Sequence, residues 1–185
     1  MRKDYSLLEV MNVLPYNKNF DLEFKQENLK TIYLAGGCFW GTDAYMARVY
    51  GVAKTESGYS NGNIPLPVTY EEVYTDATGY AEVVKVIYDT TRVSLSEVLA
   101  EFFSITNPTT LNKQAEDVGT RYRSGLYYED EADIPILEEA IAKIQAKYEL
   151  PVVTSIEAVT NYQPAEEYHQ NYLEKNPNGY CHVQF

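Results

Sequence analysis

The residue best suited to nucleophilic chemistry is Cys38, which lies in the hexapeptide GGCFWG at residues 36–41. An apolar run at residues 31–35 precedes the two glycines, and residues 38–50 contain few helix breakers. The sequence therefore predicts a strand, a tight turn and a helix that begins at Cys38. The unpaired N–H groups and the dipole at a helix N-terminus favour a thiolate over a thiol. Cys38 is thus a candidate nucleophile, and the alternative is a small buried thiol without reactivity.

Few residues are available to act together with Cys38. His169 and His182 are the only histidines, and either one beside Cys38 would make a thiol hydrolase. Cys181 lies beside Gly179 in a C-terminal stretch that could carry it to Cys38, where the two cysteines would exchange oxidation states. Two cysteines and two histidines without paired short spacings make a poor metal site, so we expect no metal. A non-catalytic acidic binding domain with inert thiols is a further alternative.

The composition restricts the partners of the protein. Its 185 residues are 45% apolar, which is enough for one substantial buried core. With 15 basic and 27 acidic residues the formal net charge is −12, and a field of this sign repels nucleic acid and anionic lipid. Asp4 and Glu9 interrupt the first apolar stretch, no run reaches transmembrane length, and two cysteines make no disulfide scaffold. We therefore expect a cytoplasmic monomer without nucleic-acid or membrane partners.

The elements that must position Cys38 are predicted from apolar periodicity. Strands are expected at residues 31–35, 52–59, 82–88, 122–128 and 152–159. Helices are expected at residues 38–50, at residues 134–148, at residues 165–173 and after Ser94, which forms a capping box with Glu97. Residues 63–70, which include two prolines, and residues 107–119 are expected to be loops.

This order of elements predicts a two-layer α+β sandwich in which helices pack on one mixed β-sheet, of the ferredoxin-like plait type. Residues 1–29 are polar and mixed, and we expect them to form an N-terminal extension. Residues 30–185 then form a single catalytic domain whose C-terminal tail carries Cys181.

The motif GGCFWG resembles the signature of the A-type peptide methionine sulfoxide reductases, and further matches follow in unbroken order as far as Cys181. A shared order of several rare motifs is far more specific than any one motif. The matching residues are Gly58 and Tyr59; the segment GYAEV at residues 79–83; Tyr88 and Asp89; Pro108 to Thr110, Asn112 and Gln114; Asp117, Gly119, Tyr122, Arg123 and Ser124; Ala165, Glu166, Tyr168, His169, Gln170, Tyr172 and Leu173; and Asn176, Pro177, Gly179, Tyr180 and Cys181. Departures from the family pattern, none at a catalytic position, are Asp43, Tyr80, Thr106, Asn107, Lys113 and Ala115.

The resemblance implies an oxidoreductase that repairs proteins under oxidative stress by reducing the S epimer of methionine sulfoxide, free or in proteins. It identifies Cys38 as the nucleophile that attacks the sulfoxide sulfur and becomes a sulfenic acid. Glu82 matches the family's acid, and desolvation at the start of its strand would raise its pKa and keep a proton available at neutral pH. Cys181 matches the resolving cysteine, which forms a disulfide with Cys38 that a thioredoxin-like protein reduces. No bound cofactor is implied.

The resemblance also implies a substrate site. Tyr70 and Tyr122 match the hydroxyl donors that bind the sulfoxide oxygen. Phe39 and Trp40 would form an apolar wall around the S-methyl group, because a methyl group is recognised by shape. Asp117 matches a residue that helps to position the substrate and the tyrosines.

His169 decides between two kinds of enzyme. In the family it matches a structural residue, whereas a cysteine hydrolase, the alternative function, would need His169 as the base that activates Cys38.

Overall fold

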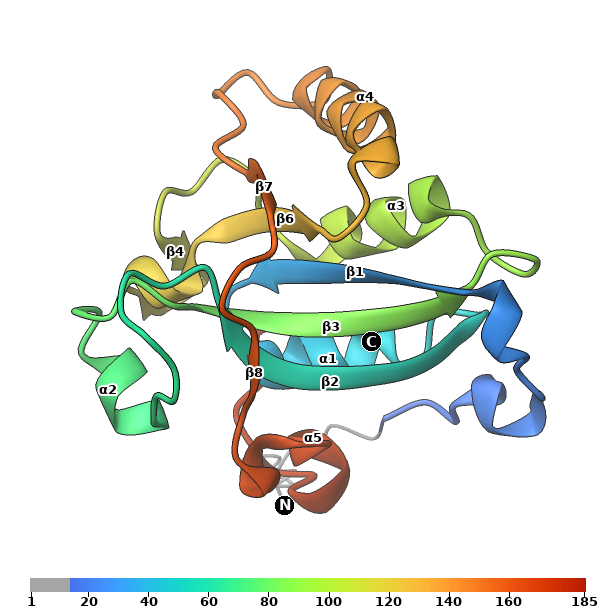
Figure 1. Cartoon of the computed structure of the whole chain (residues 1–185), viewed down its shortest axis with the longest axis horizontal. Coiled ribbons are helices and arrows are strands. Elements are labelled where there is room, and N and C mark those ends of the chain that lie inside the picture. The colour runs from blue at the N-terminus through green and yellow to red at the C-terminus, as the bar shows by residue number, and fades with distance from the viewer. Residues whose placement is uncertain (1–13) are drawn as a thin grey trace, which may run out of the picture.

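The computed structural model describes residues 14–185, so residues 1–13, the first part of the expected N-terminal extension, lie outside the described residues. Its centre is a six-stranded sheet with the strand order β7-β6-β1-β3-β2-β8 (Figure 1). These strands are β1 (Leu29–Gly36), β2 (Val52–Ser60), β3 (Ala81–Asp89), β6 (Ser124–Tyr128), β7 (Ser155–Ala158) and β8 (Gln163–Pro164). A separate hairpin pairs β4 (Lys113–Gln114) with β5 (Asp117–Val118).

Four strands and two helices make the scaffold that carries Cys38. The chain runs through β1, α1 (Phe39–Met46), β2, β3, α3 (Leu95–Ile105) and β6 in that order, with other elements between them. Strand β1 pairs antiparallel with β3 and β6, and β2 pairs antiparallel with β3. Strand β7 pairs parallel with β6 at one edge, while β8 pairs antiparallel with β2 at the other. The prediction of a mixed sheet combined with helices is therefore confirmed.

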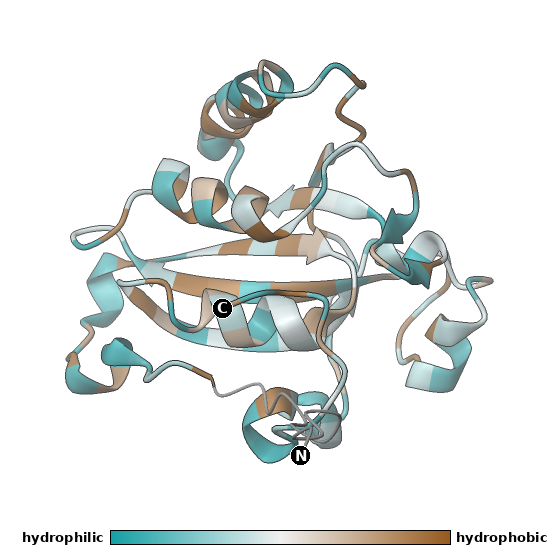
Figure 2. Ribbon diagram, turned by 180° about the vertical axis from the view of Figure 1, so that it is seen from behind, coloured by the Kyte–Doolittle hydropathy of each residue, from teal (hydrophilic) through white to brown (hydrophobic). Residues whose placement is uncertain are grey.

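The longer helices gather on one side of the sheet. Helix α1 packs on β2 and β3, and α3 packs on α1 and on α4 (Ile134–Gln145). Figure 2, which views the molecule from behind, shows α1 in front of the sheet. The two remaining α-helices, α2 (Tyr70–Tyr74) and α5 (Tyr172–Lys175), are short, and α5 contacts α1.

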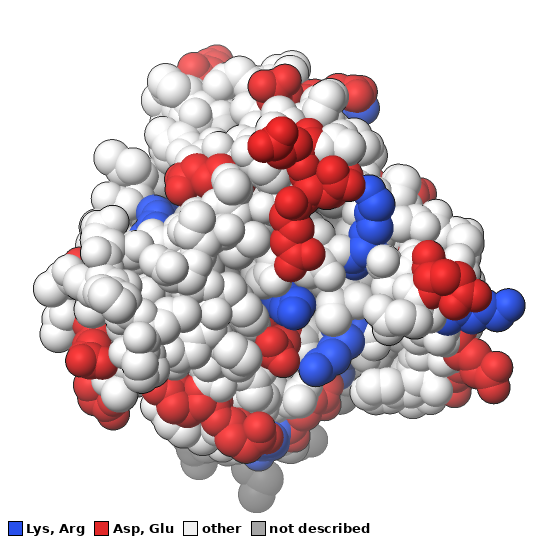
Figure 3. Space-filling view, in the orientation of Figure 1, with Lys and Arg blue, Asp and Glu red and all other residues white. Residues whose placement is uncertain are grey.

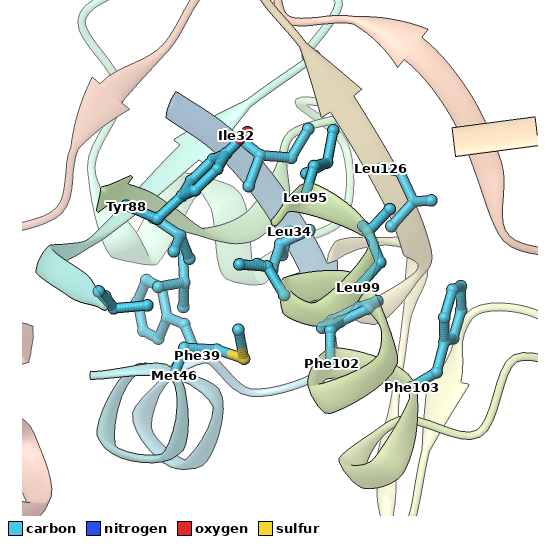
Figure 4. Close-up of a cluster of buried hydrophobic side chains, with 14 of the residues drawn as sticks. Ile32, Leu34, Phe39, Met46, Tyr88, Leu95, Leu99, Phe102, Phe103 and Leu126 are labelled. Carbon is cyan, nitrogen blue, oxygen red and sulfur yellow. The ribbon is translucent and has the colours of Figure 1, made fainter. Parts of the chain in front are cut away.

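Side chains of β1 alternate between two apolar clusters because successive residues of a strand point to opposite faces. Ile32 and Leu34 are fully buried in the main core, together with residues from α1 and α3. Figure 4 shows this core, with Phe39 and Met46 from α1 and Leu95, Leu99, Phe102 and Phe103 from α3. Tyr33 and Ala35 join a smaller cluster with Tyr127, against which Tyr162 packs. The strand that leads to Cys38 is thus fixed on both faces.

The predicted start of α3 is confirmed at atomic level. The Glu97 N–H donates to Ser94 Oγ at 3.2 Å, and the Ser94 N–H donates to Glu97 Oε2 at 2.8 Å, which completes the capping box. The same motif, formed by Thr69 and Glu72, caps α2. No helix was expected at α2, because the two prolines just before it indicate a loop. The T-x-x-E spacing was the signal that would have identified it.

Several predicted boundaries are wrong. The helix expected at residues 38–50 ends at Met46, and the strand expected at residues 152–159 spans only Ser155–Ala158. The strand expected at residues 122–128 begins at Ser124, because Thr120–Tyr122 forms a 3-10 helix, η3. The loop expected at residues 107–119 contains the β4–β5 hairpin. The helix expected at residues 165–173 is divided into the 3-10 helix η5 (Glu167–His169) and α5, because Asn171 between them adopts a left-handed φ of 50°.

Asn19 joins the described part of the N-terminal stretch to the end of α1. Its Nδ2 donates to the carbonyls of Ala47 at 2.9 Å and Val49 at 2.8 Å, and its Oδ1 accepts the Gly51 N–H at 2.9 Å. One buried side chain therefore satisfies three backbone groups in the turn between α1 and β2.

The surface carries the acidic excess of the sequence. Figure 3 shows Asp and Glu side chains spread over the face seen in Figure 1, in keeping with the net charge of −12. Within residues 14–185, no helix combines the length and the apolar character that crossing a membrane requires.

Candidate active site

Cys38 lies between the end of β1 and the start of α1, as the sequence predicts. Gly37 forms the turn with a φ of 84°, a left-handed value that favours glycine. Cys38 directly precedes the first residue of α1, and only 7% of its surface is exposed. The strand and the turn thus deliver the thiol to the N-terminal end of the helix, at the margin of the core.

The protonation of Cys38 depends on two opposing effects, the helix N-terminus and burial. Burial raises the pKa of Cys38 well above its ordinary value, the nearby Glu82 carboxyl raises it further, and a hydrogen bond from the backbone N–H of Trp40 lowers it. The helix N-terminus acts in the expected direction, but the loss of hydration outweighs it. Cys38 therefore rests as a thiol.

Glu82 is the second residue of β3 and is 2% exposed. Its Oε2 accepts the backbone N–H of Phe39 at 3.0 Å. Burial raises the pKa of Glu82 to about 8, although the hydrogen bond from Phe39 acts against the shift. The carboxyl is thus desolvated, and its raised pKa favours the protonated form at neutral pH.

Phe39 and Trp40 begin α1 and lie in an aromatic cluster. Phe39 is 1% exposed, and its ring centroid lies 5.0 Å from that of His169. Trp40 is partly buried and stacks on Tyr172, with ring centroids 3.7 Å apart and planes 11° apart. The first turn of the helix thus presents an indole ring whose orientation is fixed by stacking.

His169 supports this cluster and not the thiol. Its Nδ1 accepts a 3.0 Å hydrogen bond from Trp40 Nε1, and burial lowers its pKa, so the ring is neutral. No hydrogen bond joins His169 to Cys38 in the part of the chain that the structure describes.

The hydroxyl candidates Tyr70 and Tyr122 come from two short helices. Tyr70 begins α2, and Tyr122 ends η3 and is buried. Burial raises the pKa of Tyr70 to about 12 and also raises the pKa of Tyr122 above its ordinary value. Both hydroxyls are therefore protonated at neutral pH and able to donate hydrogen bonds.

Asp117 lies in β5 and faces the C-terminal residues. Its Oδ2 accepts the Tyr180 hydroxyl at 3.2 Å and lies 4.0 Å from Nδ1 of His182. Burial raises the pKa of Asp117. Cys181, between these two tail residues, is partly buried, and its Sγ donates to the carbonyl of Val183 at 3.3 Å. Both cysteines are free thiols.

Several of these groups influence the protonation of one another. Beside burial, the largest cause, Glu82, Asp117 and Cys181 each raise the pKa of Cys38. The same type of interaction links Cys38 and Glu82 with Tyr70. The structure thus brings candidates from β3, β5, α2 and the C-terminal residues around the N-terminal end of α1.

Sequence reasoning gave no role to two carboxylates, of which Glu166 binds Tyr59 and Tyr70 and Asp76 binds Arg121, the neighbour of Tyr122. Glu166 accepts the Tyr70 N–H at 2.8 Å and the Tyr59 hydroxyl at 2.7 Å. Asp76 accepts the Arg121 N–H at 3.0 Å and forms an ion pair with Arg121 Nη1 at 2.7 Å. These partners lie far from the carboxylates in the sequence, so no local pattern signals the contacts.

Some departures from the family pattern have a structural account. Ala115 stands where glycine is usual and has a φ of 49°, a left-handed value that favours glycine. Tyr80 donates its hydroxyl to the carbonyl of Ile64 at 2.8 Å. Asp43 is 3% exposed in α1, and burial raises its pKa to about 6.

Within residues 14–185, no group of three or more His, Cys, Asp or Glu side chains is arranged to hold a metal ion.

Comparisons with known proteins identify the family of the chain. The family model for peptide methionine sulfoxide reductase matches residues 30–185. Peptide methionine sulfoxide reductase MsrA of Clostridium perfringens (strain 13 / Type A) is 49% identical over 156 residues, 84% of this chain and 99% of that protein. MsrA of Clostridium acetobutylicum is 48% identical over 155 residues, 84% of this chain and 95% of the relative.

Solved structures show the same likeness. Reduced Mxr1 from Saccharomyces cerevisiae has a TM-score of 0.80 and 39% identity, over 88% of this chain and 94% of that one. Methionine sulfoxide reductase A of Corynebacterium diphtheriae has a TM-score of 0.75 and 34% identity, over 84% of this chain and 79% of that one. Mxr1 in complex with Trx2 has a TM-score of 0.58 and 29% identity, over 82% and 89% of the two chains. Since the family model covers residues 30–185 and relatives at 48–49% identity are spanned almost end to end, this chain belongs to the peptide methionine sulfoxide reductase family.

Proposed function

We propose that this chain reduces methionine S-sulfoxide, free or in proteins, to methionine, with Cys38 as the nucleophile, Glu82 as the acid and Cys181 as the resolving cysteine. One observation carries the proposal. A carboxyl with a pKa of about 8 is hydrogen-bonded to the residue that follows a buried thiol. Sulfoxide reduction by a thiol requires a sulfur nucleophile and a proton for the departing oxygen at the same place.

In the first step Cys38 sulfur attacks the sulfoxide sulfur, and Glu82 donates its proton to the sulfoxide oxygen. The oxygen passes to Cys38 as a sulfenic acid, so the cysteine sulfur is oxidised, the methionine sulfur is reduced and methionine leaves. The proton that leaves the Cys38 thiol replaces the one that Glu82 gives up. A thiol and a protonated carboxyl are therefore a consistent resting pair, because the step needs no net proton from solvent.

The remaining candidates bind the substrate. Tyr70 and Tyr122 donate hydrogen bonds to the sulfoxide oxygen, which stabilise the charge that develops on it. Phe39 and Trp40 contact the S-methyl group. Asp117 helps to position the substrate.

In the second step Cys181 attacks the sulfenic acid of Cys38. A disulfide forms and the hydroxyl leaves as water, taking the proton of the Cys181 thiol. A thioredoxin-like dithiol protein then reduces the disulfide and is itself oxidised. The solved complex of Mxr1 with Trx2 supports this choice of partner.

The experiment that tests this function counts thiols before and after one equivalent of a methionine S-sulfoxide is added without reductant. We expect stoichiometric sulfide, loss of both thiols and a peptide that links Cys38 to Cys181. Cys181→Ser is the matched control, because it should release the same sulfide but retain a sulfenic acid at Cys38. Persistence of both thiols without sulfide would disprove the proposal.

A cysteine hydrolase that uses Cys38 and His169 is the second candidate from the sequence. The geometry speaks against it, because Nδ1 of His169 already accepts a hydrogen bond from Trp40. In addition, burial lowers the pKa of His169 and so disfavours the charged ring that forms when a general base takes a proton.

The proposal also covers the domain organisation, the fold type, the oligomeric state and the cellular location of the protein. Residues 30–185 form the single catalytic domain and residues 1–29 an extension. The four strands β6, β1, β3 and β2, in this order and all antiparallel, support a ferredoxin-like plait as the core of the fold. The protein acts as a monomer, without nucleic acid or membrane, in the cytoplasm, where dithiol reductants keep protein thiols reduced.

A further inference from the structure

The C-terminal tail, residues 180–185, lies against α1 (Figure 2). Alternate side chains of the tail make two sets of contacts. Cys181 and Val183 lie on Gly41 of α1. The ring of Phe185 follows them along the helix, 6.1 Å from the ring of Tyr45 and 6.0 Å from Cζ of Arg48.

The other tail residues face Asp117. Tyr180 donates its hydroxyl to Asp117 Oδ2 at 3.2 Å, and His182 Nδ1 lies 4.0 Å from the same oxygen. The His182 side chain is only 4% exposed. Residues on both sides of Cys181 are thus turned toward Asp117.

The tail packs directly against Gly41 of α1. A Cβ built on Gly41 would lie 2.9 Å from Cγ2 of Val183 and 3.0 Å from Sγ of Cys181. The helix itself has no need of glycine there, because Gly41 is not among the glycines with a positive φ, and alanine favours a helix more. The tail alone excludes a side chain from this position.

The position of Gly41 in the helix relates the tail contact to Cys38. Gly41 lies in the first turn of α1, three residues after Cys38, which is the N-cap residue of the helix. The Cys181 sulfur that rests on Gly41 is also among the groups near enough to raise the pKa of Cys38.

We infer that Gly41 is a positioning residue for the resolving step, because its missing side chain leaves a seat on α1 that holds Cys181 beside Cys38, while Asp117 holds the opposite side of the tail. The inference rests on the proposed role of Cys181. In that step the Cys181 thiol displaces the hydroxyl of the Cys38 sulfenic acid, a sulfur–sulfur bond forms, and hydroxyl and thiol proton leave as water. Attack on the sulfoxide uses Cys38 and Glu82, so the seat affects only the second step.

The test measures both steps in one turnover without reductant, in wild type, Gly41→Ala, Gln184→Ala and Cys181→Ser. Sulfide release reports the first step. Loss of the second thiol, with trapping of sulfenic acid by dimedone, reports the second. Gln184→Ala is the matched control, because Gln184 is an exposed tail residue that does not lie on Gly41. Cys181→Ser shows the result expected when no disulfide with Cys38 can form.

We expect Gly41→Ala to release sulfide like wild type but to form the disulfide between about tenfold and about a hundredfold more slowly, since a displacement of about 1 Å has effects of this size. The sulfenic acid should then be trapped at Cys38, as in Cys181→Ser. The double variant Gly41→Ala/Val183→Ala removes the closer of the two clashes and should recover part of the rate.

Disulfide formation at the wild-type rate in Gly41→Ala overturns the inference. Loss of sulfide release in the same variant also overturns it, because the effect would then not be confined to the second step. Failure of the proposed function is distinguishable from both, since wild type itself would release no sulfide.

Discussion

Oε2 of Glu82 accepts a 3.0 Å hydrogen bond from the backbone N–H of Phe39, the residue that follows Cys38. This bond ties the carboxyl on β3 to the first residue of α1, and therefore to the thiol. A carboxyl with a raised pKa in contact with the helix N-terminus can lose its proton to a substrate and keep one favourable partner for the charge that it acquires.

Glu82→Gln should slow sulfide release in a single turnover by between about a hundredfold and about ten thousandfold, the usual contribution of a general acid. The amide oxygen can still accept the Phe39 N–H, so the fold is expected to persist. In wild type the rate should fall as pH rises through the Glu82 pKa of about 8, because the proton donor is lost. The variant should lack this fall. An unchanged pH profile in the variant would assign the titration to another group.

The same carboxyl should make stability depend on pH. The pKa of Glu82 is raised from 4.5 to about 8, so between these values the folded state holds a proton that the unfolded state has released. The contribution of Glu82 to stability is therefore fully present below about pH 4.5 and is lost as pH rises through about 8. Denaturant unfolding should show a steeper loss of unfolding free energy in wild type than in Glu82→Gln. Asp43, with a pKa of about 6, contributes to both proteins, so the difference isolates Glu82. Equal slopes would contradict the assignment.

His169→Ala should destabilise the fold by about 1–3 kcal/mol, because the Trp40 N–H loses its acceptor. His169→Asn supplies an oxygen to that N–H and is the control that should recover part of the loss. Sulfide release by His169→Asn should remain within a few-fold of wild type. Complete loss of turnover with unchanged stability would instead support a base at this position.

Asp76→Asn should raise KM more than it lowers kcat. Asparagine tolerates the left-handed φ of 61° at this position, so the backbone is kept while the charge opposite Arg121 is removed. Arg121 is buried and lies 4.3 Å from the ring of Tyr122, so its displacement moves a proposed substrate residue. We expect a loss of stability of about 2 kcal/mol. Initial rates over a range of sulfoxide concentrations, with denaturant unfolding, provide the measurement, and an unaltered KM would refute the role given to Arg121.

The strands and the place of Cys38 were predictable because their signals are local. The run of Val and Ile in β3 and the two glycines before Cys38 each determine structure within a few residues. The burial of Glu82 carries no local signal, because a glutamate at the start of a strand is usually solvated; only the family resemblance indicated it. Its contact with Phe39 needs β3 beside β1, a pairing of distant segments.

The protonation of Cys38 was not predictable for a related reason. The sequence indicates its position at the helix N-terminus, which favours a thiolate, but it does not indicate the burial that favours the thiol. Tyr59, Tyr70 and Glu166 show the same limit, since their contacts join residues up to 107 positions apart.

Met46 lies in the main core with no exposed surface. It is the only methionine within residues 14–185, and its thioether is the very group whose oxidised form is the proposed substrate. An oxidant that converts exposed methionines elsewhere to sulfoxides must first open this core to reach Met46. The folded domain should therefore resist the oxidising conditions that produce methionine sulfoxide, because its own methionine is shielded from the oxidant.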